Sequence, residues 1–285
     1  MELELPPAPL LDASRFQVAI RRLADSLGYG TDRSIFKGSG TEYEQSRIYQ
    51  PGDPVKAIDW RVTARTGKVH VKEYEAPRRI PAWMLVDTSA SMTVGSRRPT
   101  KYETAVTIAG GLALACLDRA SPVGCLGVGG RTILVRPTLS RVSVTAWLHR
   151  LRRHRLDEPT TLGSAPPFLE PMLPERSLLF VLSDLHDQGA AAGLSRLAMR
   201  HDVCVIILRD PAERGLRGGF LRGREAETGR AITTAGRFAP SLAETRLAAL
   251  AAARIDGLVV DTDRPYAARL RLLLSRRRLL DAKGR

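Results

Sequence analysis

Residues 83–92 read WMLVDTSASM, an apolar segment that ends abruptly in polar residues. Pro81 precedes the segment, and residues 83–86 are all apolar. This pattern is typical of a strand that is covered on both faces, as in a parallel sheet between two layers of helices. Ligands of such sheets collect just beyond the carboxyl ends of the strands. The stretch therefore predicts a buried strand that leads into a binding loop.

The polar residues after this strand include three hard oxygen donors at alternate positions. They are the carboxylate of Asp87 and the hydroxyls of Ser89 and Ser91. An extended or tightly turned loop can direct all three toward one point. Such donors suit Mg²⁺, Mn²⁺ or Ca²⁺ rather than zinc. The D-x-S-x-S pattern also arises by chance, so its position after a buried strand carries the interpretation.

Beyond Pro81, apolar runs alternate with amphipathic segments, which is typical of a doubly wound α/β fold with a mostly parallel sheet. The helix predicted over residues 101–120 is so apolar in its second half that we expect it to be largely buried. We predict strands at 83–86, 123–128, 132–135, 177–182, 202–208 and 258–260, helices at 101–120, 142–153, 190–200, 241–254 and 265–280, and an inserted hairpin at 218–234 that turns at Thr228-Gly229.

The residues before Pro81 have a different texture. Apolar residues at helical spacing predict a helix over 14–28, and a stretch rich in Gly, Thr and Tyr with short alternating runs follows. We therefore divide the chain into an N-terminal helical segment (1–28), a small β-rich subdomain (29–80) and the α/β domain (81–285). Within the subdomain, Asp59 and Arg47 could form a buried carboxylate–guanidinium pair under the indole of Trp60.

A second acidic residue, Asp184, follows the strand predicted at 177–182. Parallel strands end at the same edge of a sheet, so we expect Asp87 and Asp184 to share one ion, with Asp184 holding a metal-bound water. The polar loop 157–163 offers a further hydroxyl to this edge. An octahedral cation would keep one open position that an acidic group of a partner could fill. The alternative for Asp184 is a cap for the following helix.

The formal net charge of +14 raises the possibility of nucleic-acid binding, because a basic surface attracts phosphate without any specific motif. The arginines, however, cluster at 150–155 and 269–278, near the ends of predicted helices, where they favour the helix dipole and cover apolar surface. Only 5% of the residues are aromatic, which argues against base stacking. A docking surface for an acidic protein partner fits this charge better.

The sequence also bears on the cellular compartment. The N-terminal residues lack the basic and apolar regions of a secretory signal, and no run approaches the roughly 18 apolar residues of a membrane helix. Three widely spaced cysteines fit neither a disulfide framework nor a C-x-x-C metal site. We expect a cytoplasmic protein without a membrane span and with reduced thiols.

The motif D-T-S-A-S-M after an apolar strand resembles the metal-ion-dependent adhesion site of von Willebrand factor type A domains. The preceding R-I-Y-Q-P-G-D-P-V-K-A-I-D-W-R-V-T-A-R is similar to the signature of the bacterial family known as domain of unknown function 58, and L-R-D-P-A-E, R-E-A-E-T-G-R and L-L-L-S-R-R extend the likeness over roughly residues 38–278.

This resemblance implies metal ligands in three loops: Asp87, Ser89 and Ser91 in the first, Thr160 in the second and Asp184 in the third. Family members usually have Gly-Thr-Asp in the second loop, whereas this chain has Pro159-Thr160-Thr161, so either threonine could supply the hydroxyl. The implied function is a non-enzymatic protein-interaction module, accessory to a MoxR-type AAA+ ATPase that remodels or matures client proteins.

An enzyme is the alternative, because Asp87 and Asp184 around Mg²⁺ would also suit a phosphatase or phosphoryl-transfer site. The chain contains no G-x-x-x-x-G-K-[ST] loop, no G-x-G-x-x-G spacing and no G-x-S-x-G elbow. His186 is a possible base close to Asp184, but nothing in the sequence pairs it, and we interpret it as a surface-loop histidine. The motifs therefore favour binding over catalysis.

Overall fold

The computed structural model describes residues 2–4, 13–28, 43–74, 80–93, 95–130, 133–155, 158–159, 161–173, 176–187, 189–214, 220–224, 231–235 and 242–276. A six-stranded sheet at its centre has the order β12-β9-β8-β4-β5-β6. All neighbouring strands run parallel except β6, which pairs antiparallel with β5. The strands are β4 (Ala82–Asp87), β5 (Val123–Val128), β6 (Ile133–Thr138), β8 (Leu178–Ser183), β9 (Asp202–Arg209) and β12 (Asp256–Asp261).

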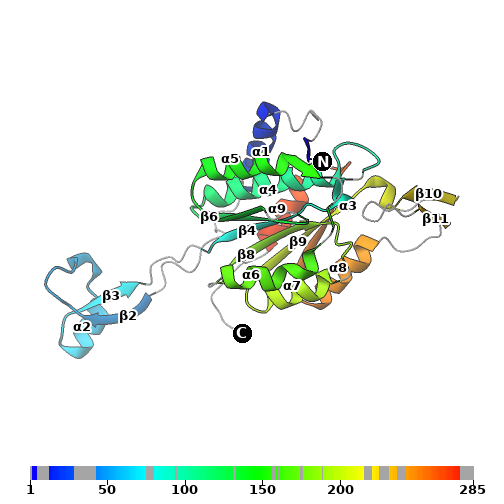
Figure 1. Ribbon diagram of the computed structural model, residues 1–285. Helices are drawn as coiled ribbons and strands as arrows, with labels where there is room; N and C mark the ends of the chain where they lie inside the picture. The colour runs from blue at the N-terminus through cyan, green and yellow to red at the C-terminus, as the bar shows by residue number, and fades with distance from the viewer. Residues whose placement is uncertain are drawn as a thin grey trace.

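Helices cover both faces of this sheet (Figure 1). One face carries α1 (Ala13–Gly28), α4 (Lys101–Leu117), α5 (Arg141–Arg152) and α9 (Ala267–Arg276), whose buried residues share one core cluster. The other face carries α6 (Ala165–Leu169), α7 (Ala190–Ala198) and α8 (Leu242–Ala252), which share a second cluster. The mixed α/β architecture with a mostly parallel sheet, predicted from the alternation of apolar runs, is thereby confirmed.

The central strand β4 explains why the opening motif is apolar on both sides. Ala82, Met84 and Val86 belong to the core of the α4 face, whereas Trp83 and Leu85 belong to the core of the α7 face. Successive side chains of a strand point to opposite faces, so a strand between two helical layers requires apolar residues at every position. Asp87, at the carboxyl end of this strand, therefore directly follows residues of the buried core.

Helix α1 packs on α4 through two glycines of the longer helix. A Cβ atom on Gly111 would lie 2.5 Å from Leu23 Cδ2, and one on Gly110 would lie 2.7 Å from Ile20 Cγ2. Only glycine allows the two helices to approach this closely. The Gly-Gly pair, which interrupts the strong helix pattern of α4, is therefore the place where α1 packs on this helix.

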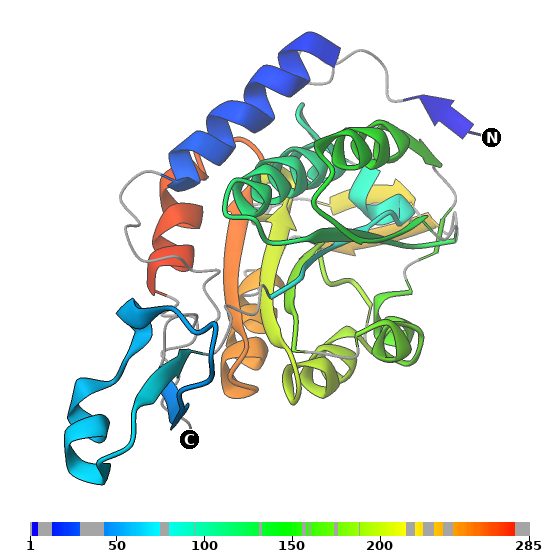
Figure 2. The same cartoon turned by 90° about the vertical axis from the view of Figure 1, so that its left-hand side faces the viewer.

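A small unit stands apart from the main sheet (Figures 1 and 2). It contains the antiparallel strands β2 (Tyr43–Ile48) and β3 (His70–Tyr74), the 3-10 turn η1 (Val55–Ala57) and helix α2 (Trp60–Thr66). The pattern predicted strands here but not α2, which begins at the cap Asp59 and ends at the left-handed Gly67. This short helix is stabilised by its two caps rather than by a long periodic face.

Two further pairs of strands complete the description. β1 (Glu2–Glu4) pairs with β7 (Arg153–Arg155), so the arginine cluster at 150–155 lies partly in a strand and not wholly at a helix end as predicted. β10 (Phe220–Arg224) and β11 (Ala231–Ala235) form the expected hairpin, although its predicted turn at residues 228–229 lies outside the described residues. Across the described chain, no helix combines the length and apolar character that crossing a bilayer requires.

Candidate functional site

The carboxyl ends of β4 and β8 bring the two predicted acidic residues to one edge of the sheet. These strands are hydrogen-bonded neighbours, with Val86 opposite Leu182, so Asp87 and the Ser183-Asp184 pair leave the sheet side by side. The Ser183 hydroxyl donates to Asp87 Oδ2 over 2.5 Å. Both acidic side chains are buried, and Asp87 is only 1% exposed. Two buried carboxylates therefore lie at the ends of neighbouring strands, where water hardly reaches them.

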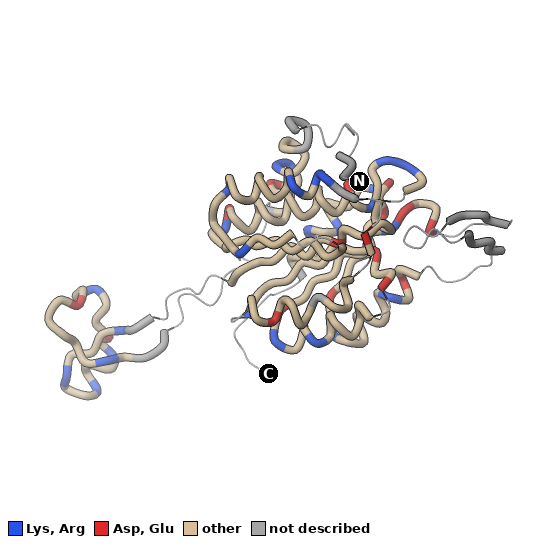
Figure 3. The backbone as a smooth tube through the Cα atoms, in the orientation of Figure 1, with Lys and Arg blue, Asp and Glu red and all other residues tan. Residues whose placement is uncertain are grey.

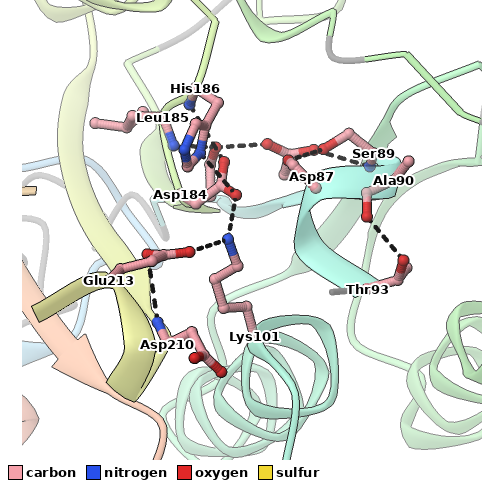
Figure 4. Close-up of polar contacts among 12 residues, drawn as sticks. Asp87, Ser89, Ala90, Thr93, Lys101, Asp184, Leu185, His186, Asp210 and Glu213 are labelled. Atoms are coloured by element: carbon pink, nitrogen blue, oxygen red, sulfur yellow. Dashed lines mark hydrogen bonds and ion pairs between the residues drawn. The ribbon is translucent and has the colours of Figure 1, made fainter. Parts of the chain in front are cut away.

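The loop after Asp87 turns tightly and brings both serines into the same place. The Ser89 amide donates to Asp87 Oδ1 over 2.9 Å, and Ser89 and Ser91 hydroxyl oxygens lie 3.1 Å apart. Helix α3 (Ala90–Thr93) starts within this loop. Figure 4 shows the loop beside Asp184. Three of the predicted ligands are thus gathered at one point, as their alternate spacing indicated.

The electrostatics of Asp87 are those of a buried charge without a cation. Burial, and then repulsion from Asp184, raises the pKa of the Asp87 carboxyl to about 6. Three hydrogen bonds from Ser183 and Ser89 oppose the rise. Among the described residues, no lysine, arginine or histidine forms a salt bridge with Asp87. A cation at this point would remove the unfavourable energy that its carboxylate carries.

Asp184, in contrast, has a cation of its own that the sequence reasoning missed. Lys101, the first residue of α4, is only 2% exposed, and its ammonium lies 2.7 Å from Asp184 Oδ2 and 2.6 Å from Glu213 Oε1. Figure 4 shows this side chain reaching from α4 to both carboxylates. Glu213 belongs to η4 (Pro211–Arg214), which follows β9. A lysine at the start of an apolar helix was the only signal in the sequence.

Further contacts fix the orientation of Asp184. His186 places Nδ1 2.9 Å from Asp184 Oδ2 and donates its amide to Oδ1, and Arg246 of α8 donates to the Asp184 carbonyl oxygen over 2.7 Å. Burial raises the pKa of Asp184, but the hydrogen bond from His186 and the charge of Lys101 outweigh this and hold the pKa below its ordinary value. The alternative role of Asp184 as a helix cap is wrong, because Gly189 precedes α7.

The second loop is anchored to the first by a glutamate that the motif analysis did not select. Thr88 Oγ1 donates to Glu158 Oε2 over 2.6 Å, and the amide of Ala90 donates to the Glu158 carbonyl oxygen over 2.8 Å. Thr160 lies outside the described residues. Thr161 turns its hydroxyl toward the carbonyl oxygen of Gly129, at 3.4 Å. The loop is therefore held against the site, while the threonine ligand stays a prediction.

These residues fit a hard divalent cation on the Asp87 side of the edge. Carboxylate and hydroxyl oxygens are the donors that Mg²⁺ and Mn²⁺ accept, and Asp87 supplies an uncompensated charge. The described residues contain no group of three His, Cys, Asp or Glu side chains arranged around a metal position. A site here would consequently depend on Ser89 and Ser91 as well as on carboxylates.

The motif around Asp59 differs from its interpretation. Arg47 pairs with Asp53, with two contacts of 2.7 Å, and not with Asp59. Asp59 instead caps α2 and accepts a hydrogen bond from Ser46 over 2.8 Å. The Trp60 side chain covers neither, because it is 68% exposed. A helix starting at residue 60 carries the indole outward, and the sequence pattern did not predict that helix.

Comparison with known proteins finds similar chains that align with most of this one. Uncharacterized proteins of Mycobacterium bovis and Mycobacterium tuberculosis are 29% identical over 92% of this chain and 88% of their own length. Among solved structures, the conserved hypothetical protein BatB from Bacteroides thetaiotaomicron aligns with 69% of this chain and 98% of its own, with 18% identity and a TM-score of 0.47.

A family model gives the more decisive match. The family described as "Protein of unknown function DUF58" matches residues 45–244, a range that runs from β2 to α8 and includes Asp87, Lys101, Glu158 and Asp184. The match covers more than half of the chain and contains the described candidate ligands Asp87, Ser89, Ser91 and Asp184. This protein therefore belongs to the DUF58 family.

Proposed function

We propose that this protein is a von Willebrand A-like module that binds a protein partner through a divalent cation at the carboxyl edge of its sheet. The buried Asp87 carboxylate carries the proposal. It lies beside the Ser89 and Ser91 hydroxyls, and among the described residues no basic side chain forms a salt bridge with it. A buried carboxylate without a counter-charge is costly, and sites of this kind are concentrated where proteins bind ligands.

Asp87, Ser89 and Ser91 would hold the cation, with Thr160 and Asp184 as the further expected ligands. When bound, the cation would supply positive charge with one open position for a carboxylate. Lys101 neutralises Asp184 and thereby limits the negative charge of the edge. This balance favours capture of an acidic group, because two uncompensated carboxylates would repel it.

For the partner, the resemblance to the MoxR-associated proteins suggests a MoxR-type AAA+ ATPase, with this module as an accessory in the remodelling or maturation of client proteins. The charge of the chain is compatible with that role. A net charge of +14 accelerates the encounter with an acidic protein and suppresses the encounter with basic ones.

Calorimetric titration with Mn²⁺ and with Mg²⁺ tests the metal. We expect saturable binding by the wild-type chain and its loss in Asp87→Ala. Asp25→Ala is the matched control, because Asp25 is an exposed α1 carboxylate paired with Arg21. Equal binding by the wild type and by Asp87→Ala would refute the metal assignment.

A second experiment separates the proposed function from its alternatives. Binding to a purified MoxR-type ATPase should require the cation and disappear with chelator and in Asp87→Ala. Nucleic-acid binding would persist in chelator and fall steeply with salt. Turnover of a generic phosphate ester that is lost in Asp184→Ala would instead show an enzyme.

A further inference from the structure

The exposed face of α2 is a second surface that the carboxyl-edge site does not use. Trp60, Arg61, Ala64 and Arg65 are exposed, whereas Val62 and Thr63 between them are partly buried. Residues four apart lie above one another on a helix, so Trp60 stands over Ala64 and Arg61 over Arg65. We call these four residues the α2 face. It places the indole of Trp60 beside the two arginines.

The indole of Trp60 is unusual in its exposure. It is 68% exposed, whereas Trp83 and Trp147 are each 1% exposed. Tryptophan is enriched among the residues that dominate the binding energy of protein interfaces, where its large apolar ring and its N–H both find partners. Ala64, one turn along and also exposed, is too small to cover the ring. A partner's apolar side chain can therefore pack against the exposed indole.

The two arginines of the α2 face carry charge that the described residues do not neutralise. No described acidic side chain forms a salt bridge with Arg61 or Arg65. Two acids of this unit whose side chains are described are already engaged, since Asp53 pairs with Arg47 and Asp59 is buried as the cap of α2. Figure 3 shows further basic residues around this small unit. The surface therefore complements a negatively charged partner.

We propose that the α2 face binds an acidic amphipathic helix of a partner protein. Carboxylates at positions i and i+4 of such a helix have the same spacing as Arg61 and Arg65. An apolar residue on the adjoining stripe meets Trp60. Nucleic acid fits less well, because binding a single strand uses several stacking aromatic residues along a basic groove and this face has one. The proposal is independent of the cation site.

Tryptophan fluorescence of the full chain provides a direct test. Because the other two tryptophans are buried, quenching by acrylamide reports mainly on Trp60. The probe is a capped synthetic helix with a leucine stripe bordered by glutamates at i and i+4. A peptide of the same composition, rearranged so that leucines and glutamates share no face, is its control. We expect the first peptide alone to shift the emission to the blue and to protect Trp60 from acrylamide.

Substitutions test whether the peptide binds at the α2 face. Trp60→Ala and Arg61→Glu/Arg65→Glu should each weaken binding of the labelled peptide by roughly tenfold or more. Val142→Ala, at an exposed apolar residue of α5, and Arg269→Glu/Arg271→Glu, an equal charge change at exposed residues of α9, are the matched controls and should bind like the wild type.

Four outcomes would overturn the inference. They are no saturable binding of the peptide, equal binding of its rearranged control, unchanged affinity in both α2-face variants, and stronger binding of oligothymidylate or of phosphatidylserine vesicles. Chelator and Asp87→Ala distinguish this inference from the proposed function. Peptide binding should survive both, and its loss would move the peptide to the carboxyl edge and refute a site on α2.

Discussion

Asp87→Asn should stabilise the metal-free protein at neutral pH, although it alters a buried residue at the centre of the candidate site. The native state holds a proton on Asp87 more tightly than the unfolded chain does, because its pKa rises from 3.8 to about 6. Stability is therefore lost as the pH rises through this interval. Asparagine keeps the acceptor for the Ser89 amide and cannot ionise, so the variant avoids the loss.

The size of the effect follows from two opposing terms. The raised pKa corresponds to roughly 3 kcal/mol of instability once Asp87 is charged. Against this, the Ser183 hydroxyl donates to Asp87 Oδ2 and accepts from the Leu185 amide, so an asparagine NH₂ at this position loses about 1 kcal/mol of hydrogen bonding. The variant should be about 1 kcal/mol less stable near pH 3, below the unfolded pKa of Asp87, and about 2 kcal/mol more stable near pH 7.5.

Urea unfolding in chelator at a series of pH values measures this crossover. Adding Mn²⁺ should then stabilise the wild type by mass action and leave Asp87→Asn unchanged. Two results would refute the reasoning. One is a variant that is less stable than the wild type at every pH, and the other is a difference between the two that does not change with pH.

Two other changes probe the support of the site and of the fold. Lys101→Met should lower the free energy of unfolding by about 3 kcal/mol, because it leaves the buried Asp184 carboxylate without its ammonium partner, and urea denaturation should show Asp184→Asn/Lys101→Met recovering part of the loss. Gly111→Ala should lower the free energy of unfolding by about 1–3 kcal/mol, because its methyl group would collide with Leu23. Limited trypsin digestion should then cut first at α1. Ala251→Gly, at an exposed residue of α8, is the control and should leave α1 protected.

The sequence allowed the central architecture to be predicted because the signals are local. A strand with apolar residues on both faces must lie between helical layers, and β4 does. The alternate spacing of Asp87, Ser89 and Ser91 predicted that one loop would gather them, since a tight turn needs no distant residue. Asp184 could be placed at the same edge because parallel strands share their carboxyl ends.

Residues that act across long separations could not be predicted in this way. Lys101 and Asp184 are 83 positions apart, and Thr88 and Glu158 are 70 apart, so no sequence window contains either pair. The exposure of Trp60 was also hidden, because an aromatic residue in a motif is usually buried and only the short, capped helix α2 carries it outward.

The sequence by itself thus determined which strands form the sheet and which oxygen donors follow them, because apolar periodicity and loop spacing depend only on residues that are close together in the sequence. Only the tertiary structure decided the charges around those donors. Because α4 packs against the strand ends, the ammonium group of Lys101 pairs with Asp184 and not with Asp87. That difference arises from the position of a helix in space, and it distinguishes the two carboxylates of the candidate site.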